Sequence, residues 1–180
     1  MTPRTWQEDP MEIQYKLTEE DVVAFNLYHV KHSKVGKNSL QWQRYISPLI
    51  FLLFAYFLSV FTEMPKGPLF AAFGITAVLW VIFYPKYFYF HITRQVRKML
   101  KEGKNEGLVG EHLMKMNKPG ITDKTSVGET AVQWTGIKQL REDAEYFYVY
   151  TSTVSAYIIP KRDVYSADGF KSYVRKRMLA

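Results

Sequence analysis

Two long apolar runs, separated by only four residues, constrain this chain more than any other feature of its sequence. Residues 45–62 (YISPLIFLLFAYFLSVFT) carry no formal charge, and neither do residues 67–85 (GPLFAAFGITAVLWVIFYP). As helices, the two runs would extend for roughly 27–29 Å, close to the ~30 Å hydrocarbon thickness of a bilayer. The alternative is a pair of core helices in a soluble protein, but such helices usually keep a polar stripe. We therefore expect a transmembrane helical hairpin over residues 45–90, with spans at about 45–62 and 67–85.

The basic residues beside the two runs predict how the hairpin is oriented. Four precede the first run and six follow the second: Lys31, Lys34, Lys37, Arg44, Lys86, Arg94, Arg97, Lys98, Lys101 and Lys104. The turn between the runs, residues 63–66, holds a single lysine. Because the cytoplasmic flanks of membrane helices are enriched in Lys and Arg, both termini of this multi-pass chain are expected in the cytoplasm.

Small residues along the two runs indicate close helix packing. They are Ala55, Ser59, Gly67, Ala71, Gly74 and Ala77. They would let the two spans pack on each other, or let two copies of the chain associate as a homo-oligomer. Pro48 is expected in the first turn of its helix, where its missing N–H costs least.

The net charge and the amino-acid composition exclude several classes of protein. The net charge is +7, yet residues 1–85 are neutral overall, and the excess lies in residues 86–106 (+4) and 107–180 (+3). Because the positive excess follows the apolar block directly, it argues against a nucleic-acid partner. The chain has no cysteine, which excludes disulfide scaffolds, thiolate metal sites and cysteine nucleophiles. The first 44 residues are polar, so no secretory signal is expected.

The residues around the hairpin predict an α+β protein. In the cytoplasmic segment 1–44, Met11–Leu17 alternates like a strand, and Thr18 is a good N-cap for a helix over residues 22–34 that ends near Gly36. Residues 91–106 are expected to continue the second span as a basic juxtamembrane helix as far as Gly103.

The last segment, residues 107–180, has the pattern of short strands. Candidate strands are 111–117, 121–125, 129–134, 139–141, 145–151 and 155–159, followed by a helix over Ala167–Met178. Tight polar or glycine-containing connections between them predict an antiparallel meander. We expect a PH-like antiparallel β-roll closed by the C-terminal helix, with the N-terminal strand and helix joining it. Trp134 and Ile137 are expected in its core.

Three short motifs in this segment resemble those of a known family. They are Trp134-Thr-Gly-Ile137, Tyr146-Phe-Tyr-Val-Tyr150 and Ile158-Ile-Pro-Lys-Arg162. Together with the order of elements over residues 11–178, they resemble the YcxB-like family of bacterial membrane proteins. The resemblance implies a bacterial cytoplasmic-membrane protein with a PH-like domain. It implies no catalytic activity and therefore supplies no catalytic residues.

The sequence offers little support for an enzyme, a metal site or a bound cofactor. The chain has four histidines, His29, His32, His91 and His112. His29 and His32 share a helix face without an acidic residue at ligand spacing and are expected at a surface or interface, and His91 is expected at the membrane interface. No phosphate-binding or hydrolase motif is present. Glu142, Asp143 and Glu145 are expected as solvated charges in a hairpin turn. We expect a non-catalytic protein without cofactor or metal.

Clusters of basic residues are the remaining candidates for a functional surface. They are Arg94, Arg97, Lys98, Lys101, Lys161, Arg162, Arg175, Lys176 and Arg177. These side chains would contact anionic lipid or an acidic protein partner, or they are topogenic and solvated charges without a ligand. The expected function is a cytoplasmic PH-like interaction module on a membrane anchor. The alternative, by analogy of fold, is an immunity protein against a peptide toxin or an accessory subunit of a membrane complex.

Overall fold

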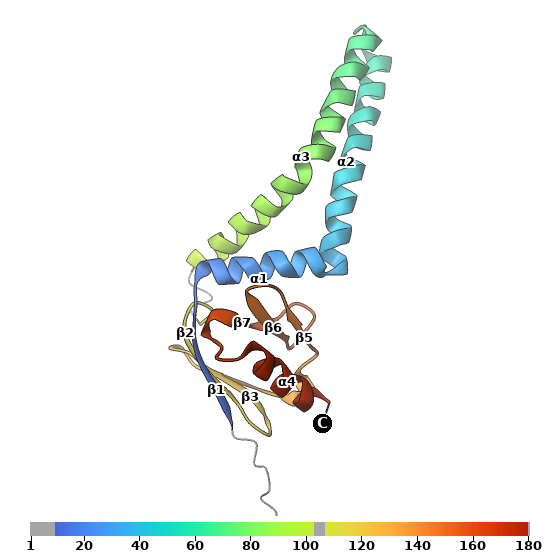
Figure 1. Cartoon of the computed structure of the whole chain (residues 1–180). Helices are drawn as coiled ribbons and strands as arrows, with labels where there is room; N and C mark the ends of the chain where they lie inside the picture. The colour runs from blue at the N-terminus through green and yellow to red at the C-terminus, as the bar shows by residue number, and fades with distance from the viewer. Residues whose placement is uncertain (1–9, 103–106, 180) are drawn as a thin grey trace, which may run out of the picture. The chain divides into compact units, whose positions relative to one another are not determined.

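The computed structural model describes residues 10–102 and 107–179 and shows an α+β protein (Figure 1). The helices and strands are β1 (Met11–Leu17), α1 (Glu19–His32), α2 (Lys34–Phe61), α3 (Lys66–Lys101), β2 (Gly110–Met116), β3 (Gly120–Lys124), β4 (Glu129–Gln133), β5 (Gln139–Glu142), β6 (Tyr146–Tyr150), β7 (Ala156–Pro160) and α4 (Ala167–Met178). Short 3-10 turns follow β4 and β7. The expected end of the juxtamembrane helix at Gly103 lies outside the described residues.

The chain divides into two compact units. The strand-rich unit contains the described residues of 1–25 and 98–180, and the helical unit contains residues 26–97. Helix α1 crosses the division after Phe25, and α3 crosses it after Arg97. The expected contribution of the N-terminal strand is present, because β1 belongs to the strand-rich unit although more than ninety residues separate it from β2.

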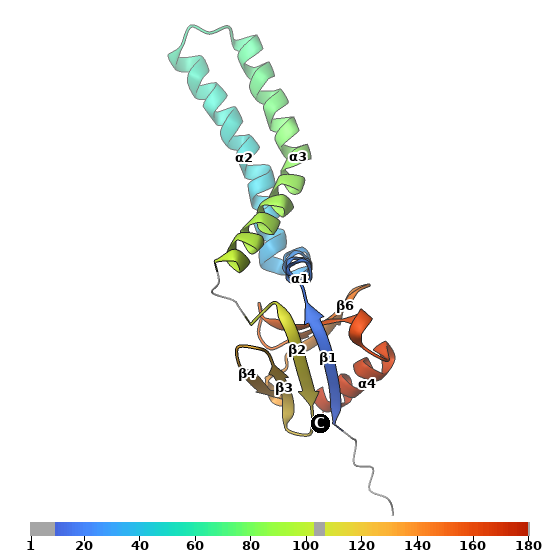
Figure 2. The same cartoon turned by 90° about the vertical axis from the view of Figure 1, so that its left-hand side faces the viewer.

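The strand-rich unit contains two antiparallel sheets, with strand orders β1-β2-β3-β4 and β5-β6-β7. Figure 2 shows β1, β2 and β3 side by side. In the register of the first pair, Met11 lies opposite Met116 and Leu17 opposite Gly110. The sequence predicted one continuous meander, whereas the structure divides it at the 3-10 turn Trp134–Gly136 between β4 and β5. The turn interrupts the ladder because its backbone bonds locally, from Ile137 N–H to Trp134 O at 3.0 Å.

The core of this unit lies on the inner faces of the sheets and around β6. All five residues of β6 are buried. On one face, Phe147 packs on Phe170 of α4 with ring centroids 4.7 Å apart. On the other, Tyr148 and Tyr150 lie 5.5 and 5.9 Å from the ring of Phe25 in α1. A strand covered on both faces loses the alternation of polar and apolar residues, which explains its sequence YFYVY.

The expected core residues Trp134 and Ile137 are confirmed. They are 8 % and 6 % exposed, respectively. The indole N–H of Trp134 donates a hydrogen bond to Asn117 O at 2.7 Å, so its one polar group is satisfied. Its ring packs edge-on against Tyr173 of α4. The closing helix is thereby attached to the first sheet as well as to β6.

In the helical unit, the boundary between the first two helices differs from the prediction. The first helix ends at His32, and Gly36, expected near its end, lies inside α2. Ser33 causes the break, because its Oγ accepts a hydrogen bond from Gly36 N–H at 3.0 Å and caps the new helix. A Cβ on Gly36 would lie 2.3 Å from Val30 O, so only glycine fits this tight turn. Since α2 begins at Lys34, Pro48 lies inside the helix rather than in its first turn.

Helices α2 and α3 form an antiparallel pair joined by residues 62–65 (Figure 1). Polar contacts join the two helices part-way along their length, since Arg44 donates to Val81 O at 2.9 Å and Trp80 donates to Gln43 O at 3.2 Å. Ala55 and Ala77 are buried, as expected for small residues between packed helices. Both helices are long and apolar enough to cross a membrane.

Candidate functional site

A cavity of about 610 Å³ opens in the strand-rich unit. Its walls come from β1, β2, β3, β4 and β7 together with the turns beside them. Ligand pockets in proteins usually have volumes of about 300–1,000 Å³. The cavity is therefore large enough for a small organic molecule.

A buried histidine and a buried aspartate lie in the wall of the cavity. His112 of β2 and Asp123 of β3 are each 5 % exposed, and their Nδ1 and Oδ2 atoms are 2.9 Å apart. Both residues line the cavity. They come together because β2 and β3 are paired, with Met114 opposite Asp123. The two side chains therefore lie on the same inner face of the first sheet.

Tyr15 of β1 holds this pair from the neighbouring strand. It lies opposite His112 in the register, and its ring stacks on the imidazole with centroids 5.0 Å apart and planes inclined by 13°. Its hydroxyl donates to Asp123 Oδ1 at 3.4 Å. Burial and the Asp123 carboxylate raise the pKa of Tyr15 well above its ordinary value, so the hydroxyl stays protonated and remains a donor.

The other ring nitrogen of His112, Nε2, is buried and has no hydrogen-bond partner among the described residues. An ionised carboxylate only accepts hydrogen bonds, so the hydrogen between His112 and Asp123 lies on Nδ1. In a neutral imidazole Nε2 is then an acceptor. A buried acceptor without a partner is uncommon in folded proteins and marks a place where a ligand or a water molecule would bind.

Two further lining residues, Thr130 and Tyr157, connect the two sheets at the cavity. Thr130 Oγ1 of β4 and the hydroxyl of Tyr157 in β7 are 3.3 Å apart. Burial raises the pKa of Tyr157, with a smaller contribution from Asp123. Most of the remaining lining is apolar and includes Leu17, Val132 and Ile158. The cavity thus combines an apolar body with a few polar groups at fixed positions.

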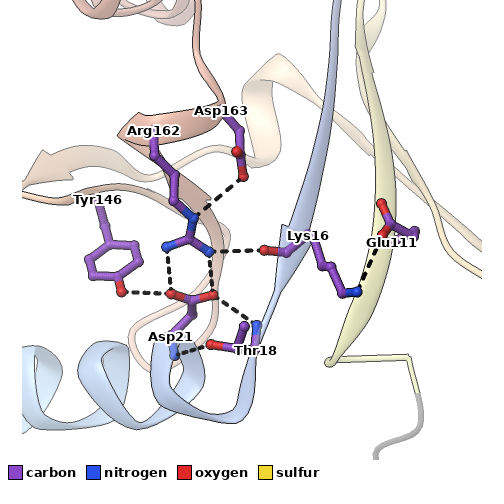
Figure 3. A network of polar contacts seen from close by, with 7 residues as sticks. All are labelled: Lys16, Thr18, Asp21, Glu111, Tyr146, Arg162 and Asp163. Atoms are coloured by element: carbon purple, nitrogen blue, oxygen red, sulfur yellow. Dashed lines mark hydrogen bonds and ion pairs between the residues drawn. The ribbon is translucent and has the colours of Figure 1, made fainter.

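A second polar cluster, shown in Figure 3, surrounds Asp21 at the start of α1. Thr18 and Asp21 cap the helix reciprocally: Asp21 Oδ2 accepts from Thr18 N–H at 2.8 Å, and Thr18 Oγ1 accepts from Asp21 N–H at 3.3 Å. This confirms Thr18 as the predicted N-cap. Arg162 donates from two nitrogens to the Asp21 carboxylate at 2.9 and 2.7 Å. It also donates to Lys16 O at 3.0 Å, and Tyr146 donates to Asp21 Oδ1 at 2.6 Å.

Hydrogen bonds within the cluster keep Asp21 ionised, and Tyr146 stays protonated. Burial opposes ionisation of Asp21, but the hydrogen bonds from Arg162, Tyr146 and Thr18 outweigh it and hold the pKa of the carboxyl well below its usual range. Burial and the neighbouring carboxylate raise the pKa of Tyr146 to about 12. Each of the two carboxylate oxygens thus accepts two hydrogen bonds from groups within the protein. Arg162, predicted as a lipid or partner contact, fastens β1 and α1 to the turn after β7.

Lys161 is also used inside the strand-rich unit. Its ammonium group contacts Glu142 Oε2 at 3.0 Å and Asp143 O at 2.6 Å, and it lies 4.7 Å from the ring centre of Phe147. Lys171 contacts the other oxygen of Glu142 at 2.5 Å. These two lysines lower the pKa of Glu142. Glu142 is therefore an ion-pair residue, and its prediction as a solvated charge is wrong.

Asp143 was also predicted as a solvated charge, but its carboxylate accepts hydrogen bonds from within the strand-rich unit. Its Oδ1 accepts from the backbone N–H groups of Glu145 and Tyr146 at 2.9 and 2.8 Å, and its Oδ2 accepts from the Tyr148 hydroxyl at 2.7 Å. Asp143 thus shapes the turn between β5 and β6, while Glu145 is exposed as predicted. The acid-rich sequence of a turn does not distinguish these roles, because they depend on side chains of other strands.

The remaining predicted basic residues lie on two helices. Arg94, Arg97, Lys98 and Lys101 follow the apolar part of α3, and all four are exposed. Arg175, Lys176 and Arg177 form the last turn of α4, where the guanidinium of Arg177 lies 4.6 Å from the ring centre of Tyr173. The nine predicted residues thus lie on α3, on α4 and in the turn after β7. Lys161 and Arg162 are bound in ion pairs of the strand-rich unit, and Lys98 pairs with Glu102 at 3.9 Å.

From the sequence alone, His112 is assigned neither a position nor a role. A signal for its burial was present in the strand itself. Residues His112, Met114 and Met116 alternate with exposed or half-buried neighbours, so the histidine shares the inner face of β2 with two methionines. Nothing in the sequence indicated that Nε2 of His112 lacks a partner among the described residues, because the position of the ring depends on Tyr15 and Asp123 of two other strands.

The fold and its cavity define a class of α+β protein in which an antiparallel strand-rich unit is interrupted by two long apolar helices. Residues 117–174 match the family model of the YcxB-like protein. The YcxB-like resemblance is thereby confirmed over this segment, which runs from the turn before β3 into α4 and includes Asp123. No curated protein matches the chain significantly.

Proposed function

We propose that the protein is a non-catalytic bacterial inner-membrane protein in which α2 and α3 form a transmembrane hairpin and the strand-rich unit is a cytoplasmic PH-like binding module. One observation carries the proposal: the outer faces of α2 and α3 are apolar and exposed. Leu53, Phe61 and Ile75 are 66 %, 70 % and 63 % exposed. Soluble monomers rarely expose large continuous apolar patches, whereas a bilayer would cover these side chains.

The aromatic residues at the ends of the apolar stretches support a membrane position. Trp42 and Tyr45 of α2 and Tyr87 of α3 are exposed near the ends that carry the basic residues. Amphipathic rings are enriched at the headgroup level of membranes. The positive-inside rule then favours a cytoplasmic position for the termini.

The order of elements supports a PH-like roll. A four-stranded and a three-stranded antiparallel sheet are followed by one C-terminal helix that packs on both sheets through Phe170 and Tyr173. In this interpretation, helices α1 to α3 are an insertion between β1 and β2, which are hydrogen-bonded neighbours. Fold alone assigns no activity, so the module is proposed as a binding unit.

Anionic lipid is the proposed contact of the bases on α3. Arg94, Arg97, Lys98 and Lys101 directly follow the apolar stretch of the same helix. Each basic residue near an anionic membrane surface contributes about 1 kcal/mol. The position of these bases beside the membrane span favours lipid headgroups over an acidic protein partner.

Lysine substitutions on the exposed apolar face test the membrane assignment. Leu53 and Val78 lie near the middle of the two apolar runs and are 66 % and 59 % exposed. A lysine at an exposed position of a soluble protein is harmless, whereas at the centre of a membrane helix it costs about 2.5–3.5 kcal/mol. Leu53→Lys with Val78→Lys should move the protein out of the alkali-resistant membrane fraction.

The control is Val154→Lys, which alters an exposed apolar residue between β6 and β7. This variant should fractionate like the unaltered protein. Recovery of the double variant in the alkali-resistant fraction at the unaltered level would refute the hairpin as a membrane anchor.

A further inference from the structure

We infer that the cavity of the strand-rich unit binds a small, uncharged and largely apolar molecule that carries a hydroxyl group, and that this hydroxyl donates a hydrogen bond to His112 Nε2. The inference goes beyond the proposed membrane-anchored module. It rests on the cavity alone and does not depend on where α2 and α3 lie.

The lining of the cavity selects against anions. Among the described residues that line it, Asp123 and Glu129 are acidic and none is lysine or arginine. A phosphate, sulfate or fatty carboxylate would therefore meet like charges without a compensating cation. Leu17, Leu108, Val127 and Val132 supply apolar surface instead. The body of the ligand is accordingly apolar and its polar group uncharged.

His112 determines which polar group fits. Its Nδ1 is paired with Asp123 Oδ2, and the stacked ring of Tyr15 fixes the plane of the imidazole. Nε2 is therefore the polar atom of this cavity-lining side chain that is left for a ligand, and it is buried without a partner among the described residues. With the Nδ1 hydrogen directed at Asp123, the neutral form of the ring accepts at Nε2, and a hydroxyl group of the ligand donates to it.

A metal ion is a poorer occupant than a hydroxyl compound. Within the part of the chain that the structure describes, no group of three or more His, Asp or Glu side chains is placed to hold a metal. His112 and Asp123 also use each other as partners, and a structural zinc site needs four ligands. The geometry thus fits recognition of an organic molecule through one hydrogen bond and apolar contacts.

Nitrogen-15 NMR of the histidines tests the inference at the atom concerned. The chain has four histidines, so the full-length protein with labelled histidine gives a simple spectrum. The probes are 2-naphthol and 2-methylnaphthalene, which have similar size and differ in the hydroxyl group. In lipid nanodiscs, with protein-free nanodiscs as the blank, 2-naphthol should shift the His112 Nε2 resonance saturably. It should bind about tenfold more tightly than 2-methylnaphthalene, the difference expected for one hydrogen bond.

Three variants separate the hydrogen bond from the cavity. His112→Phe keeps an aromatic ring against Tyr15 and removes the acceptor, so it should abolish the preference for 2-naphthol. Ala156→Leu fills the cavity from β7 and should weaken both probes. His91→Phe, which alters an exposed histidine of α3, should bind both probes as the unaltered protein does.

Several outcomes would overturn the inference. They are an unmoved Nε2 resonance in saturating 2-naphthol, equal affinity of the unaltered protein for both probes, or a preference that survives in His112→Phe. If His112→Phe does not fold, the pair of probes on the unaltered protein and the Ala156→Leu variant still decide the question. If the chain is extracted as a soluble protein, the same titration in buffer tests the cavity while the membrane proposal fails.

Discussion

Asp21 shows at the scale of one residue why the strand-rich unit needs a distant basic partner. Its carboxylate is 3 % exposed, and Arg162, 141 positions away, supplies two of its hydrogen bonds. Bidentate guanidinium–carboxylate pairs combine charge with fixed geometry. Removal of Arg162 would leave a buried carboxylate that depends on Tyr146 and Thr18 alone. Arg162 is therefore a stabilising residue of this fold.

Arg162→Met should lower the free energy of unfolding by about 3 kcal/mol, because breaking a buried ion pair leaves one charge uncompensated. Thermal or denaturant unfolding of the purified full-length protein measures the effect. Arg175→Met, which alters an exposed arginine of α4, is the matched control and should change stability by less than about 0.5 kcal/mol. Equal stability of the two variants would show that the ion pair contributes nothing.

The same carboxylate predicts a dependence of stability on pH. The folded-state pKa of Asp21 lies below its ordinary value of 3.8, so ionised Asp21 stabilises the fold above that pH. This stabilisation is lost progressively as the pH falls from about 5 toward the folded-state pKa. The difference in unfolding free energy between the unaltered protein and Asp21→Asn should therefore narrow as the pH falls from about 6 to 3.

Glu129→Gln, which replaces an exposed carboxylate of β4, provides the background for this titration. Other groups, Glu142 among them, are common to the proteins compared, and their contributions cancel. A difference for Asp21→Asn that stays constant with pH, or one that Glu129→Gln reproduces, would contradict the assignment of this stabilisation to the Asp21 carboxylate.

At the scale of elements, the sequence predicts what local pattern determines and misses what distant pairing determines. The two apolar runs identify α2 and α3, and the alternation in Met11–Leu17 identifies β1. The break at Ser33 was missed because a serine inside a polar helical stretch is an N-cap only when the chain turns there. The ion pairs of Arg162 and Lys161 join residues far apart in sequence, so no spacing could indicate them.

Helix α3 carries an apolar stretch and a basic end in one continuous element, and this continuity predicts lipid selectivity. Arg94→Glu with Lys101→Glu reverses two exposed charges at the basic end of α3. We expect fewer anionic lipids to be retained by the purified protein, because each base contributes about 1 kcal/mol near an anionic surface. Native mass spectrometry from membranes of mixed anionic and zwitterionic lipid measures the retained lipids.

The matched control reverses two charges on another helix. Arg175→Glu with Lys176→Glu gives the same change in net charge at the end of α4. If lipid is held by the juxtamembrane bases, this control should retain anionic lipid as the unaltered protein does. The same loss in both double variants would show that net charge, rather than the position on α3, controls lipid retention.

At the scale of the whole molecule, the pairing of β1 with β2 constrains how often the chain can cross a membrane. Leu17 and Gly110 are opposite each other in the register, and all three long helices lie between them in sequence. The chain therefore returns to the side from which it left, which requires an even number of crossings. Two spans satisfy this requirement, and it is independent of the positive-inside argument.

This constraint predicts the accessibility of single cysteines, which can be introduced freely because the chain has none. Met64→Cys lies in the turn between α2 and α3, whereas Ser126→Cys and Gln14→Cys lie at exposed positions beside β3 and in β1. In intact cells, a membrane-impermeant maleimide should label Met64→Cys and leave the other two unlabelled until the cells are permeabilised.

Labelling of Ser126→Cys and Gln14→Cys alone would reverse the orientation, and absence of labelling at all three would mean that α2 and α3 do not cross. Because β1 and β3 belong to one sheet, different labelling of Gln14→Cys and Ser126→Cys in intact cells would contradict the sheet itself.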